Sequence, residues 1–316
     1  KMVARMTLPP SRRGKSEMPT LAQAASALGA LRQVVKLEPN DRDSWILGGI
    51  LLVDHLGMLE EALAWWQERR AVEPTEVTPL VEQIAILVRL GMYTQAGELL
   101  EILFSPEMES PDNRQLVKMD QVRKMVEKAA KMEKDEVFRP QNPEHSRWEI
   151  IDRMKGRKPL SETFFLFTFV APIVFLIGTV AMQLIGPSKY GFLLVFIIIL
   201  GLFMLVSRMG SGLLHTLNRH ALDLDRALDV ESTAAKLCVP EDIRGSKLYE
   251  NLLGKRPEAF RERHLKIVEA DENLVVKWRP NMPNFAVDVG WWDNADEDDE
   301  DDSESGEPIE LDGLED

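Results

Sequence analysis

Through the first 135 residues, apolar positions recur every three or four residues, with polar residues between them. This spacing is typical of amphipathic helices that bury one face against a neighbour. It predicts six helices, over residues 20–38, 41–55, 59–72, 78–90, 93–104 and 110–135. The connections between them are short, which favours antiparallel helix pairs.

Two of these helices begin at recognisable capping residues. Thr20 is placed to accept a hydrogen bond from the first turn, and Gln23 is placed to reach back and complete a capping box. Thr78 is expected to be an N-cap, because Pro79 then falls in the first turn, where its missing N–H is not needed.

Part of this helical region is repeated. "HLGMLEEALAWW" at residues 55–66 returns as "RLGMYTQAGELL" at residues 89–100, so that Gly57 aligns with Gly91 and Ala62 with Ala96 at a spacing of 34. A repeat of this length predicts stacked helical hairpins, each burying its apolar face against the next.

Two long apolar runs follow. Residues 164–185 and 190–206 contain no charged residue and are 22 and 17 residues long. As helices they would span roughly 33 and 26 Å, close to the thickness of a bilayer core. Since only "GPSK" at 186–189 separates them, we expect a transmembrane hairpin. The alternative is one buried helical hairpin in a soluble core.

Basic residues flank these runs on the outside. They are Arg147, Arg153, Lys155, Arg157, Lys158, Arg208, Arg219 and Arg226. The connecting turn contains only Lys189. The positive-inside rule therefore predicts that both termini lie on the same side of the membrane, cytoplasmic or stromal.

The formal net charge of −14 originates in one segment. Residues 293–316 hold 14 of the 52 acidic residues and no Lys or Arg, which leaves 38 acidic against 38 basic residues elsewhere. Such a tail is expected to be disordered, and it either solvates the chain or attracts a basic partner. The basic first residues are expected to be disordered or to be the end of a targeting segment.

Beyond the second apolar run, apolar residues at intervals of three and four predict a seam on a helix leaving the membrane: Leu214, Leu217, Ala221, Leu224 and Leu228. Residues 241–268 are expected to be helical and residues 273–280 to form a short strand.

No motif for catalysis or for a bound cofactor occurs in the sequence. The five histidines, His55, His145, His215, His220 and His264, form no HExxH pattern, and there is no phosphate-binding glycine loop. The single cysteine, Cys238, has no partner for a disulfide or a CxxC motif. We therefore expect no enzyme activity, no metal or cofactor, and no small-molecule substrate. Nucleic-acid binding is disfavoured, because no basic patch is interleaved with aromatic residues.

The repeated segments resemble the tetratricopeptide repeat (TPR) family. In that family a glycine ends the first helix of each pair, small alanines lie where helices cross, and a proline follows the second helix. The matching residues are Gly57, Ala62, Trp66 and Pro74 in one unit and Gly91, Ala96 and Leu100 in the next. The match covers residues 25–110, but one proline spacing is 35 rather than 34 and the second unit lacks its proline.

The resemblance also implies a binding groove for a protein segment. In the family the first helix of each unit lines the inner wall, and late positions on it contact the ligand. In this sequence these positions are Asp54, His55 and Arg89. Asp54 and Arg89 would present opposite charges to a bound segment. The alternatives are that all three are ordinary solvated residues, and that the array of hairpins binds no peptide.

The predicted fold class is all-α, in six parts. These are a disordered basic N-terminus (1–19), TPR-like helical repeats (20–110), a charged helix and linker (111–160), a transmembrane hairpin (161–209), a membrane-proximal helical region (210–292) and a disordered acidic tail (293–316).

Helical repeats followed by two membrane helices resemble plastid and cyanobacterial factors that help to build photosynthetic membrane complexes. One such family has a basic end after the hairpin, whereas this chain ends in acidic residues. The resemblance implies a thylakoid adaptor that binds protein clients or membrane-complex subunits beside the lipid bilayer. The alternatives are a stable subunit of a membrane complex and a receptor for protein targeting or organelle division.

Overall fold

The computed structural model describes residues 11–12, 15–16, 18–130, 137–185 and 189–285. Within these ranges the chain is all-α, apart from one isolated bridge and one short antiparallel ribbon. The ribbon pairs β1 (Ser11–Arg12) with β2 (Lys15–Ser16), each of two residues. The acidic tail, most of the basic N-terminus and most of the turn between the apolar runs lie outside the described residues.

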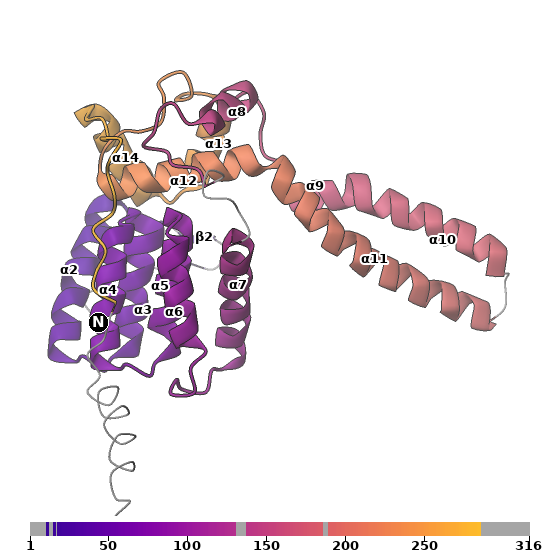
Figure 1. Cartoon of the computed structure of the whole chain (residues 1–316), viewed down its shortest axis with the longest axis horizontal. Helices are drawn as coiled ribbons and strands as arrows, with labels where there is room; N and C mark the ends of the chain where they lie inside the picture. The colour runs from indigo at the N-terminus through magenta and orange to yellow at the C-terminus, as the bar shows by residue number, and fades with distance from the viewer. Residues whose placement is uncertain (1–10, 13–14, 17, 131–136, 186–188, 286–316) are drawn as a thin grey trace, which may run out of the picture.

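Helices standing side by side form the first half of the chain (Figure 1). They are α2 (Leu21–Leu37), α3 (Arg42–Ile50), the π-helical turn η1 (Leu51–Leu56), α4 (Leu59–Val72), α5 (Val77–Leu90), α6 (Tyr93–Leu103) and α7 (Asn113–Ala130). The six predicted helices are confirmed, with ends that shift by a few residues, and the predicted end of the sixth, 131–135, lies outside the described residues. The capping box is also confirmed, because Thr20 and Gln23 exchange both of its hydrogen bonds.

The second half contains an apolar hairpin and a cap on the bundle. Its helices are α8 (Ser146–Met154), α9 (Glu162–Phe165), the π-helical turn η3 (Leu166–Val170), α10 (Ala171–Ile185), α11 (Lys189–Leu217), α12 (Arg219–Ala234), α13 (Lys247–Lys255) and α14 (Glu258–Ala270). Helix α12 crosses one end of the bundle, and the hairpin of α9 to α11 projects sideways from it (Figure 1). The expected strand over 273–280 is reduced to a single bridge between Leu237 and Asn273.

The two repeated glycines have the same structural role. Gly57 ends η1 with φ +63°, and Gly91 ends α5 with φ +78°. Both are left-handed C-caps, a conformation that glycine adopts without a steric penalty. A Cβ on Gly57 would also lie 2.4 Å from the ring of Phe260. The shared "LGM" motif therefore marks a sharp reversal between the helices of each pair.

The π-helical turn accounts for the irregular spacing of the repeat. The Gly57 N–H donates to the carbonyl of Leu52, five residues back, whereas the Gly91 N–H donates to that of Leu87, four residues back. A turn closed over five residues holds one more residue than an α turn. The first unit accommodates its extra residue in η1, so its proline spacing is 35 while the glycines remain 34 apart.

Two glycines in α3 allow α4 to approach closely. A Cβ on Gly48 would lie 2.3 Å from the Trp65 indole, and one on Gly49 would lie 2.3 Å from the Trp66 indole. The Trp65 ring also donates its N–H to the backbone carbonyl of Trp45 at 2.9 Å. The indoles thus occupy the space that a side chain at either glycine would need.

The predicted cap at Thr78 is wrong. The N-cap is Glu76, which makes no side-chain cap hydrogen bond, and the helix begins at Val77. The buried Glu76 carboxylate pairs with Arg69 at 2.6 Å and with Arg42 at 2.7 Å. These ion pairs fix the start of α5 two residues earlier than the local sequence indicates, and Thr78 accepts instead from Arg42.

We predict opposite effects for two Gly→Ala substitutions. Gly48→Ala will lower the free energy of unfolding by about 1–2 kcal/mol, because the gain in helix propensity is smaller than the overpacking against Trp65. Gly29→Ala in α2 is the matched control, because no neighbouring atom lies within 4 Å of its Cβ position. It will stabilise by about 0.5–1 kcal/mol. Thermal unfolding of the full chain in detergent measures both, and equal shifts would contradict the close approach of α3 and α4.

Candidate functional site

The apolar hairpin exposes more large apolar side chains than a soluble surface normally does. Those more than half exposed include Phe167, Phe175, Leu176, Leu184, Leu193, Phe196, Ile197 and Met204. Among the described residues, one helix, Glu162–Leu184, is long and apolar enough to cross a membrane, with a mean hydropathy of 2.4. The other arm contains a shorter apolar stretch, Leu193–Met204.

Small residues hold the two arms of the hairpin together. A Cβ on Gly178 would lie 2.7 Å from Ile199, and one on Gly210 would lie 2.9 Å from Phe165. Glycine at these positions allows the two helices to approach closely.

A polar clamp closes the base of the hairpin. Asn218 lies at the joint between α11 and α12, and its side-chain amide pairs with the backbone of Leu160, just before α9. The Asn218 Nδ2 donates to the Leu160 carbonyl and its Oδ1 accepts from the Leu160 N–H, both at 2.9 Å. This paired geometry holds the entry and exit of the hairpin together.

The flanking cations divide into two groups. Arg153, Arg157 and Lys158 are exposed beside the start of the hairpin. In contrast, Arg147 pairs with Asp223 at 3.2 Å, and three further residues, Lys155, Arg226 and Arg219, are engaged or partly buried in the fold. Three of the eight cations counted in the sequence are therefore exposed and four are engaged or partly buried, while the side chain of Arg208 lies outside the described residues.

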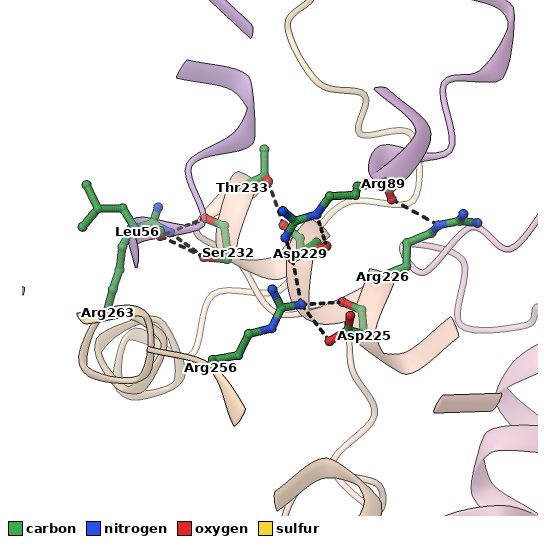
Figure 2. A network of polar contacts seen from close by, with 9 residues as sticks. All are labelled: Leu56, Arg89, Asp225, Arg226, Asp229, Ser232, Thr233, Arg256 and Arg263. Carbon is green, nitrogen blue, oxygen red and sulfur yellow. Dashed lines mark hydrogen bonds and ion pairs between the residues drawn. The ribbon is translucent and has the colours of Figure 1, made fainter. Parts of the chain in front are cut away.

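Helix α12 is joined to the repeats through the carbonyl ends of their first helices (Figure 2). Arg263 of α14 donates to the Leu56 carbonyl at 3.0 Å, and Arg226 of α12 donates to the Arg89 carbonyl at 3.2 Å. The last carbonyls of a helix carry partial negative charge and lack partners within the helix. Guanidinium groups satisfy them in both units, so the same end of each repeat is covered.

Asp229 is the central anion of this junction. Its carboxylate is buried and accepts from Nε and Nη2 of Arg89, at 3.0 and 2.8 Å. It also pairs with Arg256 at 2.9 Å. Figure 2 shows these groups meeting between α5, α12 and the start of α14. Burial opposes the charge on Arg89, but the charge and hydrogen bonds of Asp229 outweigh it and raise the pKa of Arg89. A bidentate pair of this kind specifies geometry as well as energy.

The three predicted groove residues have different surroundings. Asp54 is exposed, and His55 is half-buried, with a pKa that burial lowers despite the neighbouring Asp54 charge. Arg89 is directed at Asp229 of the same chain. Arg89 lies close enough to Asp54 for the Asp54 charge to help raise its pKa, but its ion pair is with Asp229. Helix α12 covers the end of the repeats where Arg89 lies.

The other residues selected by the resemblance lie within the packed repeats. Ala62 and Ala96 are fully buried, and Trp66 is nearly so. Leu100 is partly buried against the same core, and Pro74 lies in the turn after α4. Ala62 and Ala96 thus occupy sites where a larger side chain would overpack the bundle.

A buried polar cluster lies at the far end of α12. The Glu231 carboxylate accepts from the backbone N–H groups of Cys238 and Val239 at 2.7 and 2.8 Å. His264 contacts the Tyr249 hydroxyl at 2.7 Å and lies 3.7 Å from Glu231. Burial raises the pKa of Cys238, which disfavours its reactive thiolate. Among the described residues, no group of three or more His, Cys, Asp or Glu could hold a metal.

Sequence reasoning missed the residues that join the hairpin to the repeats. These are Asn218, Arg226, Asp229, Arg256 and Arg263. The available signal was the pattern "HALDLDRALDVES", in which charged residues flank the apolar seam on both sides instead of forming one solvated face. The predicted seam is divided at Asn218 between two helices. Ala221, Leu224 and Leu228 belong to a core with Trp148 and Ile151, whereas Leu214 packs against the hairpin and Leu217 is exposed.

Comparison of the chain with protein-family models, with curated proteins and with solved structures finds no match. Function is therefore inferred from the hairpin, the junction and the repeats themselves.

We predict that Arg89 and Asp54 differ strongly in their contribution to stability. Arg89→Met will destabilise the full chain by about 1.5–3 kcal/mol, because Asp229 loses a charge-assisted pair while buried. Asp54→Ala, at an exposed position, will change stability by less than about 0.5 kcal/mol. Thermal unfolding compares the two, and an equally small effect of both would contradict the junction.

We also predict an acid-labile contribution from His264. Burial, with the charges of nearby arginines, lowers the pKa of His264 to about 4. An unfolded histidine has a pKa of about 6.5, so between these values the unfolded state binds a proton that the folded state does not. Stability from this group is complete above pH ~6.5 and is lost as the pH falls toward ~4.

The test is the pH dependence of unfolding in His264→Gln. This variant will lose less stability than the parent between pH 6.5 and 4, by about 3 kcal/mol at most. Burial raises the pKa of Glu231, which acts in the opposite direction but is present in both proteins. Parallel pH profiles for the two proteins would rule out His264 as the source.

Proposed function

We propose that this protein is a membrane-anchored adaptor that binds protein clients beside the bilayer. The observation that carries the proposal is the exposed apolar hairpin joined to a helical repeat body through Asn218 and α12. In water the exposed apolar side chains of the hairpin would promote aggregation, whereas in a bilayer they would contact the apolar lipid tails.

The surface charges support an orientation. Arg153, Arg157 and Lys158 remain exposed at the base of the hairpin, on the side where the repeats lie. The repeats are therefore proposed to face the cytoplasm or stroma, with both termini on that side. The hairpin occupies the membrane and leaves the helical body beside its surface.

The proposed activity is binding without turnover. A repeat body tethered at the membrane raises the local concentration of its partner near membrane subunits, which is what an assembly factor requires. We extend this proposal to biogenesis of membrane complexes, with photosynthetic complexes of the thylakoid as the case that the sequence resemblance favours.

We predict that the protein behaves as an integral membrane protein. Alkaline carbonate will leave the full chain in the membrane pellet, because extraction would expose the hairpin to water. Protease added from the repeat side will remove epitopes at both ends together. Release by carbonate, or protection of one end alone, would contradict the anchor or its orientation.

A pair of charge insertions provides the control. Leu176→Arg with Ile197→Arg places two cations on exposed apolar sites of the hairpin and will weaken membrane retention. Leu116→Arg with Val117→Arg adds the same charge to exposed apolar sites on α7 and will leave membrane retention unchanged.

Native electrophoresis in mild detergent distinguishes two roles for the protein. An assembly factor will migrate with incomplete complexes, whereas a permanent subunit will migrate with the complete complex in a fixed stoichiometry.

A further inference from the structure

The chain folds one of its own extended segments onto the repeats. Residues 272–285, hereafter the C-terminal strap, follow α14 and run along α4 (Figure 1). Leu274 is buried in the repeat core, and Trp278, Met282 and Phe285 pack against that core. The strap contains no helix, and its apolar contacts are separated by polar residues.

The direction of the strap follows α4 from one end to the other. The backbone N–H of Asn281 bonds to the Glu60 carboxylate, near the start of α4. The Phe285 carbonyl accepts from Arg70 at 3.2 Å, near the end of α4. Four extended residues span about 13–14 Å, and the ten-residue rise between Glu60 and Arg70 is about 15 Å. The surface of α4 thus holds an extended chain in a defined register.

Arg70 differs from its neighbour Arg69 in how its charge is compensated. Both side chains are buried, but Arg69 pairs with the Glu76 carboxylate at 2.6 Å. Across the described residues, Arg70 finds neutral oxygens alone, those of Gln67 and Gln83 at 3.5 Å and of Phe285 at 3.2 Å. Its Nε has no partner there.

The pKa of Arg70 agrees with this lack of a counterion among the described residues. Burial lowers the pKa of Arg70 to about 10, and no carboxylate in the described part of the chain opposes this effect. A buried guanidinium is normally paired, because taking a charge out of water is costly. Arg70 thus faces the end of the strap with unused capacity to bind an anion.

We propose that the strap-binding surface of α4 is a docking site for an extended partner segment that carries a carboxylate at the position of the Phe285 carbonyl. Apolar side chains of the partner replace those of Trp278, Met282 and Phe285, and the partner's carboxylate binds the guanidinium of Arg70. This inference rests on the proposed adaptor function and names the client chemistry: an extended segment with apolar residues and a carboxylate at its end.

The strap then acts as an intramolecular competitor. It supplies the apolar contacts but offers Arg70 a neutral carbonyl, so an acidic partner gains a charge-assisted hydrogen bond that the strap lacks. Because the strap is tethered, its effective concentration is high, and a partner must bind more strongly to displace it. Clients without a suitably placed carboxylate are excluded.

The test uses two synthetic peptides of residues 272–285, "ENLVVKWRPNMPNF". One ends in a free carboxylate, which places the anion at the Phe285 carbonyl, and the other ends in an amide. Each is fluorescently labelled at its N-terminus and titrated into the detergent-solubilised full chain carrying Trp278→Ala and Phe285→Ala, which weaken the strap. We expect the acid to bind about tenfold or more tightly than the amide. The unsubstituted chain will bind both peptides more weakly.

Variants of the receptor identify the cation. Arg70→Gln, added to the weakened-strap chain, will remove the preference for the acid. Lys36→Gln, which deletes an exposed cation on α2, will preserve it. If Arg70→Gln does not fold, the comparison of acid with amide still decides the proposal. Equal binding of the two peptides, or binding of neither, would overturn it.

A third peptide tests the chain's own acidic region as the occupant. It extends to Asp288 with an amidated end, "ENLVVKWRPNMPNFAVD". Weaker binding than the free acid supports a partner carboxylate, whereas tighter binding assigns Arg70 to this chain and overturns the proposal. None of these outcomes depends on membrane insertion, so failure here is distinguishable from failure of the carbonate test.

Discussion

The placement of the hairpin relative to the repeats depends on the burial of Asp229. This carboxylate holds Arg89 from the repeats and Arg256 from the segment before α14 against a single turn of α12. Helix α12 continues from α11 at Asn218, so this turn fixes the helix from which the hairpin departs. Charge compensation at one buried point thus connects the apolar hairpin to the packed repeats.

Such a junction is demanding, because buried charges stabilise only when every partner is present. Arg226 and Arg263 extend it by capping the carbonyl ends of both repeat units. The last carbonyls of a helix have no partner within the helix, and in this chain guanidinium groups cover them in both units.

Local patterns were sufficient for the helices but not for their long-range contacts. The capping box at Thr20 and the turn at Gly57 depend on residues within one helical turn, and sequence alone located both. The start of α5 was misplaced because Glu76 is held by Arg69, on the preceding helix. Ion pairs between helices leave no periodic signal, so no reading of local sequence could place them.

The candidate site shows the same division. The apolar arms were evident from composition, because each is a long uninterrupted run of apolar residues. Arg89 lies late in α5, as the sequence indicated, but its contact with Asp229 is with a residue 140 positions away in sequence. The sequence predicted an extended segment over 273–280, but nothing in it indicated that residues 272–285 pack along α4. That contact, and the burial of Arg70 beside it, are visible only in the structure.

The second core has a consequence for how the chain is made. It joins Trp148, before the hairpin, to Leu224 and Leu252, after it. At a translation rate of roughly 5–20 residues per second, α13 leaves the ribosome several seconds after the hairpin has been completed. The second core therefore closes only after both apolar arms have been synthesised. If the hairpin enters a bilayer, as proposed, the rest of the fold is completed behind an anchor that is already in place.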